Sequence, residues 1–369
     1  SNDLVVEPRA EKGIILNSRI LWTFSRAFQV YGDTSHLQLA RRAFDYINEH
    51  FNDREFGGVF WTVDYLGRPC DTKKRTYGQA FILYALSEYH RATRSAEALN
   101  AAHLIFNLLE NRTRDPVNGG YFETFNRDWS LAADQRLSEV DQDDKKSMNT
   151  HLHVLEAYAS LARTLGVSAA AEAGVTRALR DVVDLFAGRI LDPHSAHFRL
   201  FFDEAWNVRS NHVSFGHDIE GSWLLYEAAE ILGDPQELER VNSLSVKMAQ
   251  AVYREAVDAD GALLYEADAS GIVDYDKHWW AQAEAVVGFL NAYQLTAEAD
   301  FLTAALRCWE FINSRLIDKK HGEWFWKVSR DGKPDDSKPK VDQWKCPYHN
   351  GRMCFEVLER LDSLKDRML

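Results

Sequence analysis

The sequence has few residues of the kinds that mark a disulfide-bonded, zinc-clustered or membrane-spanning protein. Its four cysteines (Cys70, Cys308, Cys346 and Cys354) form no CxxC pair. Since disulfide frameworks and zinc fingers need closely spaced cysteines, we expect free thiols in a reducing cytoplasm. No apolar run approaches the ~20 residues that cross a bilayer, and no signal-peptide pattern opens the chain. The sequence therefore predicts a cytoplasmic protein.

Positive charge is also scarce. The formal net charge is −13, and the lysines and arginines are interspersed with acidic residues rather than gathered in a stripe. Nucleic acid and anionic membrane surfaces are thereby excluded as partners. What the chain does have is a 46% hydrophobic composition, enough for a sizeable core, and eleven tryptophans. We predict one domain over residues 1–369 and a monomer.

A short glycine-plus-aromatic signal recurs along the chain. It occurs at residues 57–61, 119–122, 261–265 and 322–326, with a weaker version at 197–202. Each copy reads as a short strand followed by a turn. Such internal repetition indicates a repeated supersecondary unit.

Between these hairpins the pattern changes to a helical period. One set of segments is apolar around most of its circumference and is expected to be buried: residues 14–31, 77–92, 148–164, 217–232, 280–295 and 349–361. The other set is amphipathic and is expected to face water: residues 37–51, 99–110, 175–190, 238–252 and 301–317.

This alternation predicts an all-α fold, an (α/α)6 barrel in which an inner ring of helices is sheathed by an outer ring, with short β-hairpins at one end. The pattern both starts and ends on an inner helix, so one outer helix is expected to be missing at the N-terminus. The longest irregular stretch, 128–146, is predicted to be either a solvated loop or a lid, with neither reading favoured.

Two segments carry the strongest functional signals. His217 and Glu220 are three residues apart at a predicted helix start, where the carboxylate can orient and tune the imidazole. In the second segment Trp344 precedes His349 by five residues. Two histidines with tryptophans suggest acid–base chemistry on a sugar, because aromatic faces stack on the C–H faces of pyranose rings.

Further polar residues open the other buried helices. They are Arg19, Asn149, His153, Trp280 and Glu284. Because each lies near the N-terminal part of an inner helix, we expect the set to converge at one end of the barrel, and buried polar groups gathered at one place usually form a site. Taken alone, His153 is more often a hydrogen-bonded core histidine, and His151 is read as structural. No compact metal-ligand motif occurs, so no metal is predicted.

The same segments resemble a known family. NSRILWTFSRAF, GGVFWTVDYLGRPCDTKKRTYGQAF, SMNTHLHVLEAY, SFGHDIEGSWLL, HWWAQAEAVVGFLNAYQ and WKCPYHNGRMCFE are similar, in order, to segments of the cellobiose 2-epimerases of the N-acylglucosamine 2-epimerase superfamily. The resemblance implies an (α/α)6 barrel and an isomerase. It further implies inversion at C2 of a reducing-end sugar through a cis-enediolate, without a cofactor.

The resemblance also implies a role for each site residue. His217 and His349 would be the general acid–base pair, with Glu220 supporting the first. His153 in its protonated form and Arg19 would stabilise the enediolate. The remaining contacts to the sugar would come from Asn149, Trp280, Trp344 and Glu284.

Three other functions remain open on the sequence. One is a relative that acts on monosaccharides: a mannose 2-epimerase, a mannose isomerase or an N-acylglucosamine 2-epimerase. A second is a glycoside hydrolase that uses two carboxylates, such as Asp218 or Glu220 with Glu284. A third is a sugar-binding protein without catalysis, which would leave the histidines unexplained.

Overall fold

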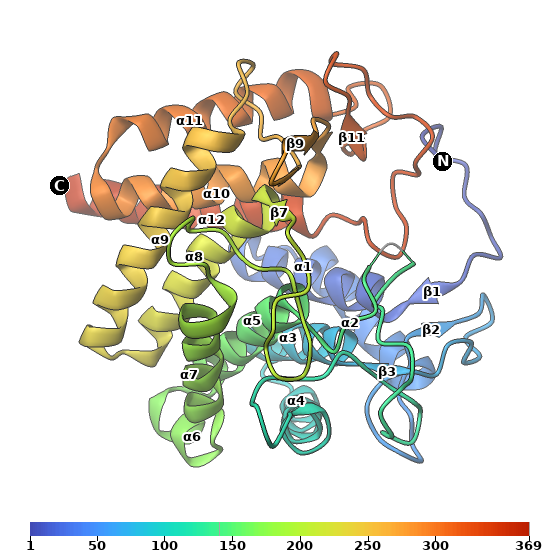
Figure 1. The fold of residues 1–369 in the computed structure, drawn as a ribbon. Helices are drawn as coiled ribbons and strands as arrows, with labels where there is room; N and C mark the ends of the chain where they lie inside the picture. The colour runs from blue at the N-terminus through green and yellow to red at the C-terminus, as the bar shows by residue number, and fades with distance from the viewer. Residues whose placement is uncertain (140, 369) are drawn as a thin grey trace. The chain divides into compact units, whose positions relative to one another are not determined.

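The computed structural model describes residues 1–139 and 141–368, which are mainly α-helical with short antiparallel strand pairs (Figure 1). The chain divides into two compact units. The first unit comprises Glu7–Leu185 and Phe201–Ser210. The second comprises Ser1–Val6, Phe186–Leu200 and Asn211–Leu369.

In the first unit, buried helices alternate with covering helices. The buried helices are α1 (Ile14–Tyr31), α3 (Thr76–Thr93) and α5 (Met148–Leu165). The covering helices are α2 (Thr34–His50), α4 (Ala96–Leu108) and α7 (Val175–Leu185), with a short α6 (Val167–Glu172) before α7. Helix α3 packs between α1 and α5, so it is buried along nearly its whole length.

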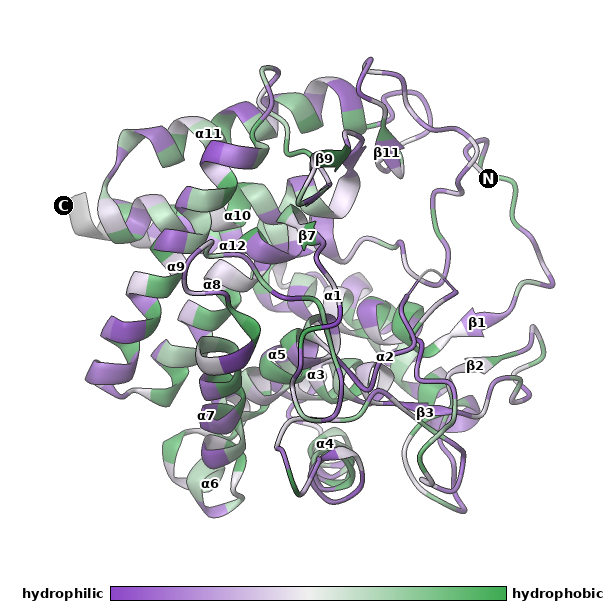
Figure 2. Ribbon diagram, viewed as in Figure 1, coloured by the Kyte–Doolittle hydropathy of each residue, from purple (hydrophilic) through white to green (hydrophobic). Residues whose placement is uncertain are grey.

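The second unit repeats this arrangement. Its buried helices are α8 (Phe215–Leu232) and α10 (Trp279–Thr296), and α10 also packs against α12 (His349–Met368). The covering helices are α9 (Pro235–Ala256) and α11 (Ala299–Phe311). Figure 2 shows the contrast, since α10 is largely hydrophobic whereas α9 carries alternating hydrophilic and hydrophobic bands.

Local sequence explains where these helices begin and end. Side-chain caps begin the covering helices α2 and α9: Asp33 accepts from Ser35 N at α2, and Asp234 accepts from Gln236 N at α9. A left-handed residue ends several buried helices, as Gly32 does for α1. Three covering helices continue into a π-helical turn, at Leu109–Thr113, Phe186–Ile190 and Ile312–Leu316.

Each buried helix except α12 follows directly from a two-residue strand in an antiparallel pair. In the first unit the pairs are β1 (Lys12–Gly13) with β2 (Thr62–Val63), β3 (Lys74–Arg75) with β4 (Thr124–Phe125), and β5 (Lys146–Ser147) with β6 (Phe201–Phe202). In the second unit β7 (Val213–Ser214) pairs with β8 (Glu266–Asp268) and β9 (Gly271–Asp274), and β10 (Lys277–His278) pairs with β11 (Lys327–Val328).

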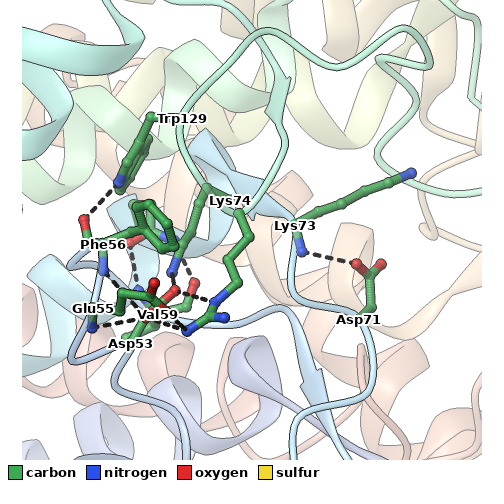
Figure 3. A network of polar contacts seen from close by, with 10 residues as sticks. Asp53, Glu55, Phe56, Val59, Asp71, Lys73, Lys74 and Trp129 are labelled. Carbon is green, nitrogen blue, oxygen red and sulfur yellow. Dashed lines mark hydrogen bonds and ion pairs between the residues drawn. The ribbon is translucent and has the colours of Figure 1, made fainter.

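A buried lysine–aspartate pair ties these strands to the glycine-plus-aromatic turns. Lys74 Nζ lies 2.9 Å from Asp53 Oδ2, and Asp53 also accepts hydrogen bonds from the backbone of its own turn (Figure 3). The equivalent pairs, all between 2.6 and 2.7 Å, are Lys146–Asp115, Lys277–Asp258 and Lys340–Asp318. Each of these four turns therefore carries a lysine–aspartate ion pair, which the sequence did not indicate.

A second kind of contact recurs at the fourth residue of several buried helices, where a side chain bonds the backbone of the glycine-plus-aromatic turn. Gln79 exchanges hydrogen bonds with the backbone of Val59, and Gln282 does the same with Leu263. His151 takes this place in α5: Nε2 accepts from Tyr121 N and Nδ1 lies 2.7 Å from Ser147 O. Burial lowers the pKa of His151 to about 4, so it is neutral at physiological pH. His151 is therefore structural, as the sequence indicated.

The predicted helices are confirmed, and among the described residues the short α6 is the one helix that was missed. The stretch 128–146, apart from Val140, is anchored through the buried Gln135. Its amide donates to Thr124 O and Ala132 O, and its backbone N–H donates to Asp143. These contacts hold the middle of the stretch against β4.

Candidate functional site

Polar side chains recur at one register of the buried helices. Seven residues after the first residue of the preceding strand stand Arg19 in α1, His153 in α5, Glu220 in α8 and Glu284 in α10. All four side chains are buried. Equal register places these groups at the same level of their helices.

In the second unit, His349 is held by a buried carboxylate. His349 begins α12, and its Nδ1 lies 2.7 Å from Glu284 Oε1. The other oxygen, Glu284 Oε2, accepts a hydrogen bond of 3.1 Å from Trp223 Nε1. The carboxylate thus holds Nδ1 of His349 and fixes the orientation of the imidazole ring.

An arginine that the sequence analysis missed joins the two carboxylates. Arg352 Nη2 lies 2.5 Å from Glu220 Oε1 and 2.6 Å from Glu284 Oε1. Arg352 Nη1 donates to Tyr348 Oη at 2.7 Å, and the guanidinium lies 4.9 Å from the centre of the Trp223 ring. The signal available in the sequence was its position, one helical turn after His349.

His217 has a hydrogen-bond partner that the sequence did not indicate. Its Nδ1 lies 2.7 Å from Ser214 Oγ, in the strand that leads into α8. Glu220, expected to support His217, is ion-paired with Arg352. The support of His217 by Glu220 stays a prediction, whereas the pairing of Glu284 with His349 is a carboxylate–imidazole contact that was not foreseen.

Trp280 contacts both histidines. Its ring centre lies 4.6 Å from that of His217 and 5.8 Å from that of His349. Gly216 permits this approach, since a Cβ there would lie 2.6 Å from the Trp280 ring. The two imidazoles that the sequence proposed as an acid–base pair thus share one aromatic neighbour.

Glu220, Glu284 and His349 could be considered as metal ligands, because one donor atom from each lies within 4.8 Å of the others. However, the Arg352 guanidinium already bonds an oxygen of each carboxylate. A divalent cation at this place would have to displace or repel the buried guanidinium. The donor set therefore does not fit a metal ion while Arg352 is in place.

In the first unit, the predicted sugar contacts lie in a second cluster. Arg19 Nη2 donates to Tyr77 Oη at 3.3 Å, and its guanidinium lies 4.6 Å from the Phe81 ring centre. The His153 ring packs against Phe81 and Tyr77, at 4.5 and 4.8 Å between ring centres. Arg19 and His153 are thus brought together around these two aromatic rings, which the sequence analysis did not identify.

Two further groups lie at the start of α5. Asn149 Oδ1 is buried and has no hydrogen-bond partner among the described residues. Glu123 accepts from Ser147 N at 2.6 Å and from Thr150 Oγ1 at 2.5 Å. Burial raises the pKa of Glu123 to about 8 against these hydrogen bonds, so this carboxyl is mostly protonated at neutral pH.

Trp344 lies in the segment that leads into α12 and is half-buried. Its backbone N–H donates to Asp342 Oδ1 at 2.7 Å. Its predicted contact with a sugar stays a prediction.

Asp218, considered above as a hydrolytic carboxylate, serves the fold. It is fully buried, accepts from Phe198 N at 2.7 Å, and lies 2.8 Å from His197 Nδ1. This is the place that Gln79 and Gln282 occupy in other repeats. Because both of its carboxylate oxygens already bond Phe198 and His197, Asp218 is a poor candidate for a hydrolytic carboxylate.

The pair of His197 and Asp218 predicts a pH dependence of stability. Burial lowers the pKa of His197, but the hydrogen bond and charge of Asp218, with Glu255, raise it to about 9. Since an unfolded histidine titrates near ~6.5, the stabilisation is fully present below that pH and is lost as pH rises through 9. We expect the advantage in melting temperature of the wild type over His197→Asn/Asp218→Asn to shrink between pH 7 and pH 10. A difference in melting temperature that stays constant from pH 7 to pH 10 would contradict a raised pKa of His197 in the folded protein.

Comparison with known proteins identifies the family. Residues 2–350 match the N-acylglucosamine 2-epimerase (GlcNAc 2-epimerase) family. The chain belongs to this family. It is 46% identical over 352 residues to the cellobiose 2-epimerase of Bacteroides fragilis, covering 95% of this chain and 88% of that protein. It is 23% identical to the D-mannose isomerase of Marinomonas mediterranea, covering 94% of this chain and 86% of that protein.

The fold of this N-acylglucosamine 2-epimerase family member agrees with the family. It matches the structure of the cellobiose 2-epimerase from Bacillus thermoamylovorans B4167 with a TM-score of 0.91 and 38% identity, over 97% of this chain and 90% of that chain. The predicted (α/α)6 fold class is thereby confirmed. Among the described residues, no helix combines the length and apolar character that a bilayer crossing requires.

Proposed function

We propose that this protein is a 2-epimerase that interconverts reducing-end glucose and mannose in β-1,4-linked disaccharides such as cellobiose, lactose or mannobiose. The observation that carries the proposal is the pair of imidazoles, His217 and His349, in contact with one tryptophan ring, Trp280. Cellobiose 2-epimerases are also much more similar to this chain than the D-mannose isomerase is, which supports a disaccharide substrate.

The proposed reaction begins with opening of the reducing-end ring. One histidine then removes the C2 proton, and the C2–H electron pair forms the double bond of a cis-enediolate. The other histidine returns a proton to C2 from the opposite face, and the ring closes on the epimer. No electron leaves the sugar, so the atoms balance without a redox partner. Imidazole suits both steps, because its pKa of ~6.5 allows either form at neutral pH.

Each histidine has the contacts that this role needs. The bond from His349 Nδ1 to Glu284 stabilises the imidazolium that forms when Nε2 takes a proton. The bond of His217 Nδ1 to the Ser214 hydroxyl holds that ring against Trp280. Glu220 belongs to the same machinery through Arg352.

The remaining predicted residues are proposed as substrate contacts. Trp280 and Trp344 would stack on the sugar. Asn149 Oδ1, which is buried without a hydrogen-bond partner among the described residues, would accept a hydrogen bond from a sugar hydroxyl. Arg19 and a protonated His153 would donate to the enediolate oxygens, and such donors are typically worth ~3 kcal/mol each.

A monosaccharide-acting relative is the second candidate, since the same proton transfer serves free mannose or N-acylglucosamine. Return of the proton to C1 instead of C2 would yield the ketose, so an isomerase differs only in the last step. We also propose that the protein is a cytoplasmic monomer that needs no cofactor.

Incubation with cellobiose in deuterated water, followed by NMR, tests the proposal. We expect glucosyl-mannose that carries deuterium at C2, without added metal or nucleotide. Free glucose would identify a hydrolase instead. No change of cellobiose together with conversion of free mannose would move the protein to the monosaccharide-acting group.

A further inference from the structure

Arg352 forms the centre of a buried charge network in the second unit. The side chain is 1% exposed, and its Nη2 is shared between Glu220 and Glu284, which are themselves 1% exposed. Glu284 Oε1 accepts from both Arg352 and His349. Arg352 and His349 thus share one carboxylate oxygen and compete for the same negative charge.

Because these groups are buried, the balance of their charges strongly affects whether the His349 imidazole is protonated. A buried carboxylate is costly unless a cation or several hydrogen bonds compensate it. Two carboxylates beside one imidazole would strongly favour the protonated ring. A histidine that stays protonated at neutral pH can donate a proton but cannot remove one from C2.

We propose that Arg352 is a positioning residue that offsets the charge of Glu220 and Glu284, and so lets His349 alternate between its neutral and protonated forms. This rests on the proposed role of His349 in proton transfer. Arg352 also orients the carboxylate, because Nη1 is fixed by Tyr348 Oη while Nη2 reaches Glu284. A lysine could supply the positive charge, but its single ammonium group lacks the planar fork that bonds Tyr348 and Glu284 from two separate nitrogens.

Several titratable groups surround His349 in the second unit, and each enters the balance. They are Glu284 on α10, Glu220 on α8, and Tyr348 and Arg352 on or next to α12, while His217 contacts the same Trp280 ring as His349 does. Of these, Glu220 allows the opposite change to that at Arg352. Replacing Glu220 with a neutral residue removes a negative charge from the network, whereas replacing Arg352 removes a positive one.

The test compares Arg352→Met with Glu220→Gln. Loss of the guanidinium should raise the pKa of His349, so in the reaction direction in which His349 removes the C2 proton, the acidic limb of kcat/KM should move to higher pH by about one unit or more. Loss of the Glu220 carboxylate should move that limb to lower pH. The double variant restores the charge balance and should return the limb towards the wild-type position, whereas Arg352→Lys should shift it less than Arg352→Met does.

A purely structural role predicts a different result. Activity would then fall in both single variants while the acidic limb stays in place, and that outcome would overturn the proposal. If Arg352→Met does not fold, a failure of Glu220→Gln to move the limb downward overturns it equally. NMR titration of isotopically labelled His349 reads the same shift without substrate. It therefore separates failure of this inference from failure of the epimerase proposal, which the deuterium experiment reports.

Discussion

Replacing His349 with asparagine should lower kcat for epimerisation by about 10²–10⁴-fold, the usual contribution of a general acid–base group. The same loss is expected for His217→Asn. Both imidazoles contact Trp280, and neither can transfer protons once replaced by an amide. The measurement is the rate of C2 epimerisation of cellobiose, with thermal unfolding to verify that each variant is folded.

The two variants should also differ from each other. If the histidines serve opposite faces of the enediolate, the remaining histidine can exchange the C2 proton of only one epimer. One variant should therefore incorporate deuterium into the glucose epimer and the other into the mannose epimer, in each case without inversion. His194→Asn is a suitable control, because His194 is exposed, and its activity should match the wild type. Full epimerisation by either active-site variant would refute the two-histidine mechanism.

Replacing Lys146 with methionine should lower the free energy of unfolding by about 3–5 kcal/mol, because it leaves a buried charge without its partner. Lys146 Nζ is fully buried, 2.7 Å from Asp115 Oδ2 and 2.8 Å from the carbonyl oxygens of Gly119 and Glu204. The variant loses the ion pair and both carbonyl contacts. Denaturant unfolding of the two proteins measures the difference.

Removal of both charges separates the ion pair from the packing. Lys146→Met/Asp115→Asn should be less destabilised than the single variant, because no charge is then buried unpaired. Lys365→Met is the matched control, since Lys365 and Asp362 form an exposed pair at 3.0 Å. That variant should change stability little. Equal effects of Lys146→Met and Lys365→Met would show that the buried pair does not stabilise the repeat.

The candidate site could be predicted in part. His217 was recognised from its three-residue spacing to Glu220 at a helix start, His349 from the tryptophan five residues before it, and Glu284 from its four-residue spacing to Trp280. Arg352 was not recognised, because an arginine in a C-terminal helix ordinarily faces water. Its contacts with two carboxylates from other helices are visible only in the folded chain. The contacts of His217 with Ser214 and of Glu220 with Arg352 were not foreseen, because spacing within one helix does not reveal partners on another element.

By itself, the sequence determined the helices, the turns between them and the residues that open each buried helix. These features depend on local periodicity, caps and glycines, which act over a few residues. The tertiary structure alone decided which charges meet: Lys146 with Asp115, His197 with Asp218, and Arg352 with Glu220 and Glu284. Such pairs join residues far apart in the chain, and their geometry exists only once the helices have packed.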